Sequence, residues 1–264
     1  MPFCRFEHKK VIRYGLIDNV PGATAITRTL LSAPSSFDDF EHGEGTEIPL
    51  NAVRLLAPTE PSKIVCVGRN YREHAKELNH PVPTEPLIFL KPPSSVIGTG
   101  HEICRPNSLS QRVDYEGELG VMISKRCCHL SAGDDVRPYI LGYTCINDVT
   151  ARDLQQKDGQ WTRAKGFDTF CPVGPVVANG LDPWKGVGVQ THVNGQVRQD
   201  GTTADFIFPL DVLIRFISQV MTLEPGDLIA TGTPAGVGPL QPGDTVEVIV
   251  EGVGTLTNSV VNLD

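Results

Sequence analysis

Short apolar runs separated by turn residues are the feature of this 264-residue sequence that most constrains its fold. Runs such as KIVCVG at 63–68, PLIFLK at 86–91 and GELGVMIS at 117–124 have the length and residue types of strands. Twenty-six glycines and 21 prolines disfavour long helices. We therefore predict an α+β fold dominated by strands, with further strands at 138–148, 174–180, 227–234 and 244–258.

Three segments are predicted to be helical. Residues 71–78 contain strong helix formers and follow Asn70, a candidate N-cap. Residues 149–156 follow Asp148. Residues 208–220 place four apolar side chains on one face, which is typical of a helix packed on a core: Leu210, Leu213, Ile214 and Ile217.

The first 60 residues differ from the rest. Short strands are expected at 3–6, 10–17 and 25–27, followed by an acidic, turn-rich stretch. The segment LLAPTEP at 55–61 favours an extended connector, because proline disfavours helix in the residue before it. We predict a small N-terminal domain or arm over 1–60 and a larger unit over 61–264.

Composition limits the partners and the compartment. A formal net charge of −8 argues against nucleic acid, which requires a concentrated positive surface. The N-terminus lacks the apolar core of a signal peptide, and no apolar run reaches the ~18 residues of a membrane span. Seven cysteines without C-x-x-C spacing indicate reduced, mostly buried thiols. We expect a soluble cytoplasmic protein without a nucleic-acid or membrane partner.

Acidic residues cluster around VDYEGELGV. On a strand, Glu116 and Glu118 project to the same side, and Asp114 would share that side. Neighbouring buried carboxylates are costly without a cation, and oxygen ligands suit Mg²⁺, Mn²⁺ or Ca²⁺. Asp148, at the end of the 138–147 strand, offers a third carboxylate. From spacing alone, an exposed strand face and a helix cap stay open as alternatives.

Two further positions suggest catalysis. His74 and Glu77 are three residues apart on a predicted helix, so the carboxylate can orient the imidazole of a general base. An exposed helix of mixed charge is the alternative. Lys165 could stabilise developing negative charge beside the acids, or be an ordinary surface lysine. The loop GTPAGVG at 232–238 lacks the Lys-Ser/Thr ending of a phosphate-binding loop.

Taken in order, these segments resemble the fumarylacetoacetate hydrolase family. The resemblance covers about residues 62–260 and rests on IVCVGRNYREHAKEL, PLIFLKP, DYEGELGVMI, INDVTARDLQ, WTRAKGFDTFCPVGP, VNGQVRQ and LIATGTPAGVG. It is greatest for bacterial enzymes and small acylpyruvase-type members. It implies a mixed β-sandwich roll of packed sheets, usually in a homodimer.

The resemblance also implies roles for individual residues. Glu116, Glu118 and Asp148 would bind one Mg²⁺ or Mn²⁺ per subunit. His74, on a lid, would be the general base, and Glu77 would be the carboxylate that orients it. Lys165 would be the catalytic lysine. Expected contacts to the substrate are Arg69, Lys91, Arg152, Gln155 and Thr233.

The expected substrate is a small anionic 2-oxo acid. Our first hypothesis is hydrolytic C–C cleavage of an acylpyruvate or fumarylpyruvate to pyruvate and a carboxylic acid, with His74 activating water. The alternative is a reaction through a metal-bound enolate: tautomerisation, decarboxylation of a β-keto acid such as oxaloacetate, or isomerisation of 2-hydroxyhepta-2,4-diene-1,7-dioate. A third possibility is a binding protein without catalytic activity.

Overall fold

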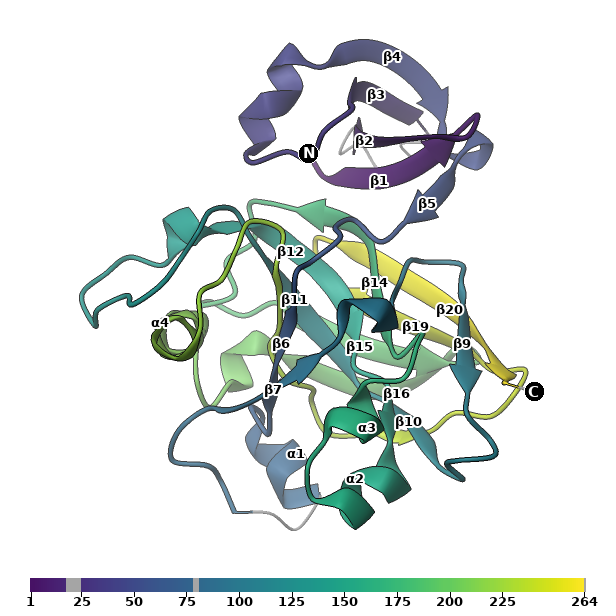
Figure 1. Ribbon diagram of the computed structural model, residues 1–264, viewed down its shortest axis with the longest axis vertical. Coiled ribbons are helices and arrows are strands. Elements are labelled where there is room, and N and C mark those ends of the chain that lie inside the picture. The colour runs from purple at the N-terminus through teal and green to yellow at the C-terminus, as the bar shows by residue number, and fades with distance from the viewer. Residues whose placement is uncertain (18–24, 78–80, 264) are drawn as a thin grey trace.

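The computed structural model describes residues 1–17, 25–77 and 81–263, and its N-terminal strands form a compact unit at one end (Figure 1). The strands lie in the order β4-β3-β2-β1, with neighbours antiparallel. Their bounds are β1 Phe3–His8, β2 Val11–Ile17, β3 Ala25–Leu30 and β4 Glu44–Pro49. The 3-10 helices η1 (Phe37–His42) and η2 (Leu50–Ala52) flank β4, and β5 (Arg54–Leu56) pairs with β1.

The same sheet continues into the larger unit, because β1 pairs with β14 at Phe3 and Val177. From there the order is β14-β12-β11-β17-β6-β7. Neighbours are antiparallel except β17 and β6. The bounds are β6 Ile64–Gly68, β7 Leu87–Lys91, β11 Gly117–Ile123, β12 Ile140–Asn147, β14 Cys171–Ala178 and β17 Leu228–Ala230; β8 (Val96–Ile97) pairs parallel with β14.

A second sheet packs against the first. Its order is β16-β15-β19-β20-β9, with bounds β9 Glu102–Arg105, β15 Gly188–Val193, β16 Gln196–Thr202, β19 Thr245–Val250 and β20 Gly254–Asn262. One buried cluster joins Leu119 and Cys145 of the first sheet to Val189 and Val248 of the second. These packed sheets confirm the predicted strand-dominated α+β fold. A third, small sheet has the order β13-β10-β18, with bounds β10 Val113–Tyr115, β13 Thr150–Ala151 and β18 Gly238–Pro239.

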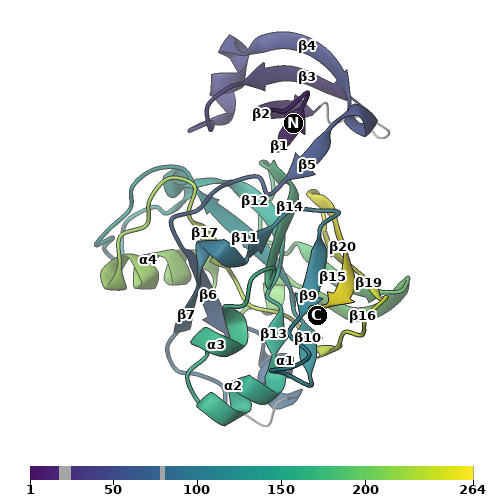
Figure 2. The same ribbon diagram turned by 45° about the vertical axis from the view of Figure 1, so that its right-hand side comes forward.

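Three short helices gather at the end of the molecule away from the N-terminal unit, as Figures 1 and 2 both show. They are α1 (Arg72–Glu77), α2 (Arg152–Asp158) and α3 (Thr162–Lys165). The longer α4 (Leu210–Val220) lies at one side of the sheets, and the predicted apolar face, which includes Leu213 and Ile217, is buried. The remaining 3-10 helices are η3 Pro93–Ser95, η4 Arg137–Tyr139 and η5 Thr203–Asp205.

Several predicted elements need correction. The helix expected at 149–156 begins only at Arg152, because Thr150 and Ala151 first pair with β10. Asn70 does not cap α1; its buried side chain bonds to the backbone of Phe208 and Thr231. The run 244–258 is two strands joined by a turn, and β9, β15 and β16 were not predicted.

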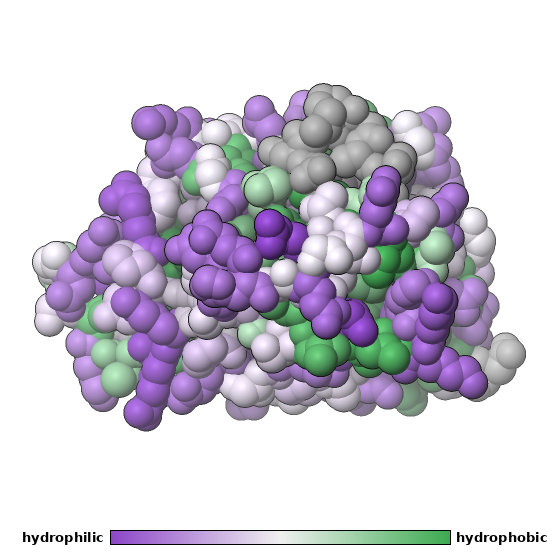
Figure 3. All heavy atoms as spheres, turned by 90° about the horizontal axis from the view of Figure 1, so that it is seen from above, coloured by the Kyte–Doolittle hydropathy of each residue, from purple (hydrophilic) through white to green (hydrophobic). Residues whose placement is uncertain are grey.

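All seven cysteines are free thiols, and five of them are buried, as predicted. Within 1–17, 25–77 and 81–263, no helix has the length and apolar character needed to cross a membrane. Figure 3 shows the molecule from above, and the coloured part of this face carries mainly hydrophilic side chains with smaller apolar groups between them.

Candidate metal centre

Two neighbouring strands bring the acidic residues together. Glu116 lies between β10 and β11, and Asp148 follows β12, which pairs with β11. The backbone N–H of Asp148 donates to the carbonyl of Glu116 at 2.8 Å. The side chain of Asn147 accepts from the N–H of Glu116 at 3.0 Å. The strand ends are therefore locked in register at the point where the carboxylates emerge.

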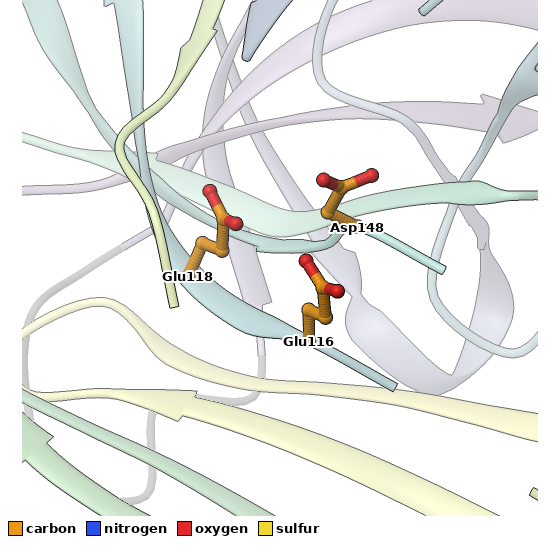
Figure 4. Close-up of side chains that lie close together, drawn as sticks. All are labelled: Glu116, Glu118 and Asp148. Atoms are coloured by element: carbon orange, nitrogen blue, oxygen red, sulfur yellow. The ribbon is translucent and has the colours of Figure 1, made fainter. Parts of the chain in front are cut away.

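The carboxylates of Glu116, Glu118 and Asp148 point toward one another (Figure 4). One oxygen of each lies within 4.8 Å of the others, and all three residues are at most 5% exposed. The expected gathering of these residues is thus present in the fold. The face predicted for Asp114 is wrong: Asp114 lies in β10, and its side chain bonds to two arginines outside this group.

Two buried lysines compensate part of this charge. The Nζ of Lys165 donates to Glu116 at 2.8 Å and to Asp148 at 2.6 Å. The Nζ of Lys91 donates to the other oxygen of Asp148 at 2.6 Å and to the carbonyl of Val149 at 3.1 Å. Burial opposes ionisation of Glu116, but Lys165 and Arg152 outweigh it and hold the pKa of that carboxyl well below its usual range.

Glu118 is in a different electrostatic position. Its carboxylate accepts from the backbone N–H of Gly232 at 2.7 Å. Burial raises its pKa well above the ordinary value, and the charges of Asp148 and Glu116 raise it further. Glu118 has no direct ion pair among residues 1–17, 25–77 and 81–263, and three converging carboxylates of this kind are a donor set that fits a hard divalent ion with oxygen ligands.

Arg152, at the start of α2, links the acids to the helix. Its Nη2 donates to Glu116 at 2.5 Å, its Nε to Asp114 at 3.0 Å, and its Nη1 to Gln155 at 2.6 Å. Arg152 is 4% exposed. Every branch of this guanidinium therefore has an acceptor, and its position is fixed from three sides.

The predicted contact between the general base His74 and the carboxylate of Glu77 is also formed. Nδ1 of His74 lies 3.3 Å from Oε2 of Glu77, and the backbone N–H of Gly236 donates to the same carboxylate at 3.2 Å. Burial lowers the pKa of His74, and the nearby Glu116 and Glu77 offset this only in part. If Nδ1 donates to Glu77, the lone pair of the imidazole is on Nε2.

A cavity of about 370 Å³ contains these groups. The predicted residues on its wall are Arg69, His74, Glu116, Glu118, Asp148, Arg152, Gln155, Lys165 and Thr233. Glu77 lies behind His74, and Lys91 lies behind Asp148. Among the described residues that line the cavity Lys91 is absent, so the substrate contact expected of Lys91 is not supported; its Nζ bonds to Asp148 instead.

Sequence reasoning missed part of the wall and part of its support. The rings of Phe89 and Trp161 meet edge to face at 5.1 Å and form an apolar side of the cavity. Gln199 donates to Thr233 at 2.7 Å and accepts from the N–H of Gly117 at 2.9 Å. Gln199 ends the quoted VNGQVRQ segment and Trp161 begins WTRAKGF, so both lay within recognised motifs without an assigned role.

The glycine-rich loop at 232–238 has a role that its sequence did not indicate. It follows β17, and its backbone donors bond to the acids: Gly232 to Glu118, and Gly236 to Glu77. Gly232 and Gly236 have φ values of +101° and +103°, which favour glycine. The loop therefore orients one candidate metal ligand and the partner of the candidate base.

Two family models match this chain, and several relatives and solved structures are similar to it. The family model for the fumarylacetoacetate (FAA) hydrolase C-terminal domain matches residues 63–261, and a model described as Rv2993c-like, N-terminal, matches 1–58. Protein Rv2993c of Mycobacterium tuberculosis is 51% identical over 219 residues, 82% of each chain. The oxaloacetate tautomerase YisK of Bacillus subtilis is 41% identical over 224 residues, 80% of this chain and 74% of that one. The crystal structure of 2-hydroxyhepta-2,4-diene-1,7-dioate isomerase from Mycobacterium marinum has a TM-score of 0.88 at 44% identity, over 99% of this chain and 98% of that one.

Proposed function

Because this chain belongs to the fumarylacetoacetate hydrolase family, whose members are enzymes that generally use a divalent metal, we propose that it catalyses a metal-dependent proton shift on a small 2-oxo dicarboxylic acid. Interconversion of the keto and enol forms of oxaloacetate is the simplest such reaction. The observation that carries the proposal is the balance of buried charge in the cavity.

That balance is nearly neutral without a cation. When all three acids are ionised as metal ligands, their charges are matched by three buried cations, Lys91, Lys165 and Arg152, which pair with Glu116 and Asp148. Asp114 is further matched by Arg112. A divalent ion would add two positive charges, which a substrate with two carboxylates would neutralise. A substrate with one carboxylate would leave a buried positive charge.

Glu116, Glu118 and Asp148 would hold the ion, and Mg²⁺ and Mn²⁺ both suit three carboxylate oxygens. When bound, the ion would act as a Lewis acid on the 2-oxo group. Lys165 lies on the cavity wall between two of the acids and could stabilise negative charge on the oxygen of the 2-oxo group. Arg69 is also on the wall but is partly exposed, so it lies outside this count of buried charges, and it could bind the distal carboxylate.

His74 would move the proton. Its neutral imidazole faces the cavity, and Glu77 orients the ring. His74 could remove the proton from the carbon beside the 2-oxo group and return a proton to the oxygen, which completes the tautomerisation without breaking a C–C bond. The names of the relatives, a tautomerase and an isomerase, describe proton shifts of this kind.

Hydrolytic C–C cleavage of an acylpyruvate is the second candidate. The His74–Glu77 pair favours it, because an oriented imidazole could equally remove a proton from a water molecule. It requires room for that water beside the substrate, and its products are pyruvate and a carboxylic acid.

The test is a substrate panel with added Mg²⁺ or Mn²⁺. The enol absorbance of oxaloacetate and the release of pyruvate would be followed in parallel for oxaloacetate, an acylpyruvate and fumarylpyruvate. We expect acceleration of the enol–keto exchange, its loss in His74→Ala, and unchanged rates in Glu85→Gln, an exposed control. Pyruvate release from the acylpyruvate at a higher kcat/KM than the exchange would overturn the proposal in favour of hydrolysis.

A further inference from the structure

Asp114 is a buried acid that the proposed chemistry does not use. It is 0% exposed and lies in β10, two residues before the candidate metal ligand Glu116. Two arginines donate to it: Arg112 through Nε at 2.9 Å and Nη2 at 3.2 Å, and Arg152 through Nε at 3.0 Å. A buried carboxylate with two cationic partners is fixed in place.

The small sheet sets the geometry of this contact. Asp114 pairs with Thr150 in the register of β10 and β13, and the hydroxyl of Thr150 lies 3.2 Å from Oε1 of Glu116. The backbone N–H of Arg152 donates to the carbonyl of Arg112 at 2.8 Å. Both ends of Arg152, backbone and guanidinium, are thus tied to the strand that carries Asp114.

Glu116 lies on the other side of the same guanidinium. Its Oε1 accepts from Nη2 of Arg152, and its Oε2 accepts from Lys165. Burial lowers the pKa of Arg152, but the charges of Glu116 and Asp114 outweigh burial and raise it. The two carboxylates therefore share one positive charge from opposite sides.

We propose that Asp114 is a positioning residue that holds Arg152 in place. By compensating part of the charge of Arg152, Asp114 weakens the attraction between Arg152 and Glu116, so that Glu116 stays available to a divalent cation. The proposal rests on the metal centre of the proposed function. Without the charge of Asp114, Arg152 would be compensated mainly by Glu116, and the guanidinium would compete with the cation for that carboxylate. Outer partners of metal ligands typically change metal affinity by about 10- to 100-fold.

The experiment measures Mn²⁺ affinity of the full-length protein by calorimetry in the absence of substrate. Asp114→Asn keeps the shape of the side chain and removes its charge, and we expect about tenfold weaker Mn²⁺ binding. Arg112→Gln is the matched control, because it removes the other partner of the same carboxylate. Its loss of positive charge should leave Mn²⁺ affinity equal or higher.

A double-mutant cycle separates positioning from a general disturbance. If Asp114 acts through Arg152, Asp114→Asn should have no further effect on Mn²⁺ affinity in an Arg152→Gln background. Equal affinities of wild type and Asp114→Asn would overturn the proposal, as would the same loss in Arg112→Gln. A wild-type protein that binds no Mn²⁺ would instead contradict the proposed metal centre.

Discussion

Replacing Glu118 by glutamine is expected to change stability and cation binding in opposite directions. Two unit charges 4.8 Å apart repel by about 3.5 kcal/mol at an effective dielectric constant of 20, and Glu118 has two acidic neighbours within that distance. Lys165 offsets only part of this repulsion. Glutamine removes the charge and keeps an oxygen for the N–H of Gly232. In the absence of divalent cations, the variant should therefore be more stable than the wild type.

The pH dependence limits the size of this gain. The ordinary pKa of 4.5 applies to the unfolded chain, and the pKa of Glu118 in the fold is raised well above it. The folded state then binds more protons, so the wild type loses stability as pH rises above about 4.5. Between pH 4.5 and pH 7 the loss reaches at most about 3.5 kcal/mol, at about 1.4 kcal/mol per pH unit. Glu118→Gln removes this loss, and the gain should disappear near pH 4.5.

Urea unfolding after EDTA treatment, at pH 5 and pH 7.5, measures the effect. Glu85→Gln, at an exposed position, is the control and should match the wild type at both values. Added Mn²⁺ should stabilise the wild type far more than Glu118→Gln, because ligand binding to the folded state contributes RT ln(1 + [L]/Kd). The reasoning fails if Glu118→Gln is less stable than the wild type at pH 7.5 without cations.

Three further outcomes are expected. Because burial lowers the pKa of His74 from 6.5, kcat/KM should fall with decreasing pH only below pH 6.5. A fall in kcat/KM that begins above pH 7 would contradict a base that is buried and neutral. A Cβ on Gly117 would lie 2.0 Å from Oγ1 of Thr191, so Gly117→Ala should lower the free energy of unfolding in urea by about 1–3 kcal/mol. Gly133→Ala, with open space around it, should be neutral. Lys91→Met removes one of the two cations that pair with the buried carboxylate of Asp148, and chemical denaturation should show a free energy of unfolding lower by about 3 kcal/mol or more. An unchanged midpoint would show that Lys165 alone compensates the charge of Asp148.

Local patterns explain which elements were predicted correctly. Alternation and turn residues placed β6, β7 and β11 within one or two residues, because strand formation there depends on adjacent side chains. The stripe of α4 was found for the same reason. The run 244–258 was not divided, because Gly252 and Gly254 mark its turn only through their positive φ values, +76° and +130°.

Some residues of the candidate site can likewise be predicted from local spacing, and others cannot. The pairs Glu116–Glu118 and His74–Glu77 are two and three residues apart in the sequence, so each pair could be found from the sequence alone. Asp114 satisfies the same alternation as Glu116, yet it faces Arg152, because the strand ends at Tyr115 and resumes at Gly117. Spacing could not separate a metal ligand from a residue that holds an arginine.

The sequence by itself determined a strand-rich chain of this family and the order of its acidic and basic motifs. Only the tertiary structure decided which charges meet. Lys91 reaches Asp148 across 57 residues, and Gly232 reaches Glu118 across 114. Such contacts depend on which strands are neighbours in the sheet, and the burial they produce sets the charge balance of the site. The local periodicity of the sequence does not predict which strands are neighbours, because the strand order follows from the packing of the whole chain.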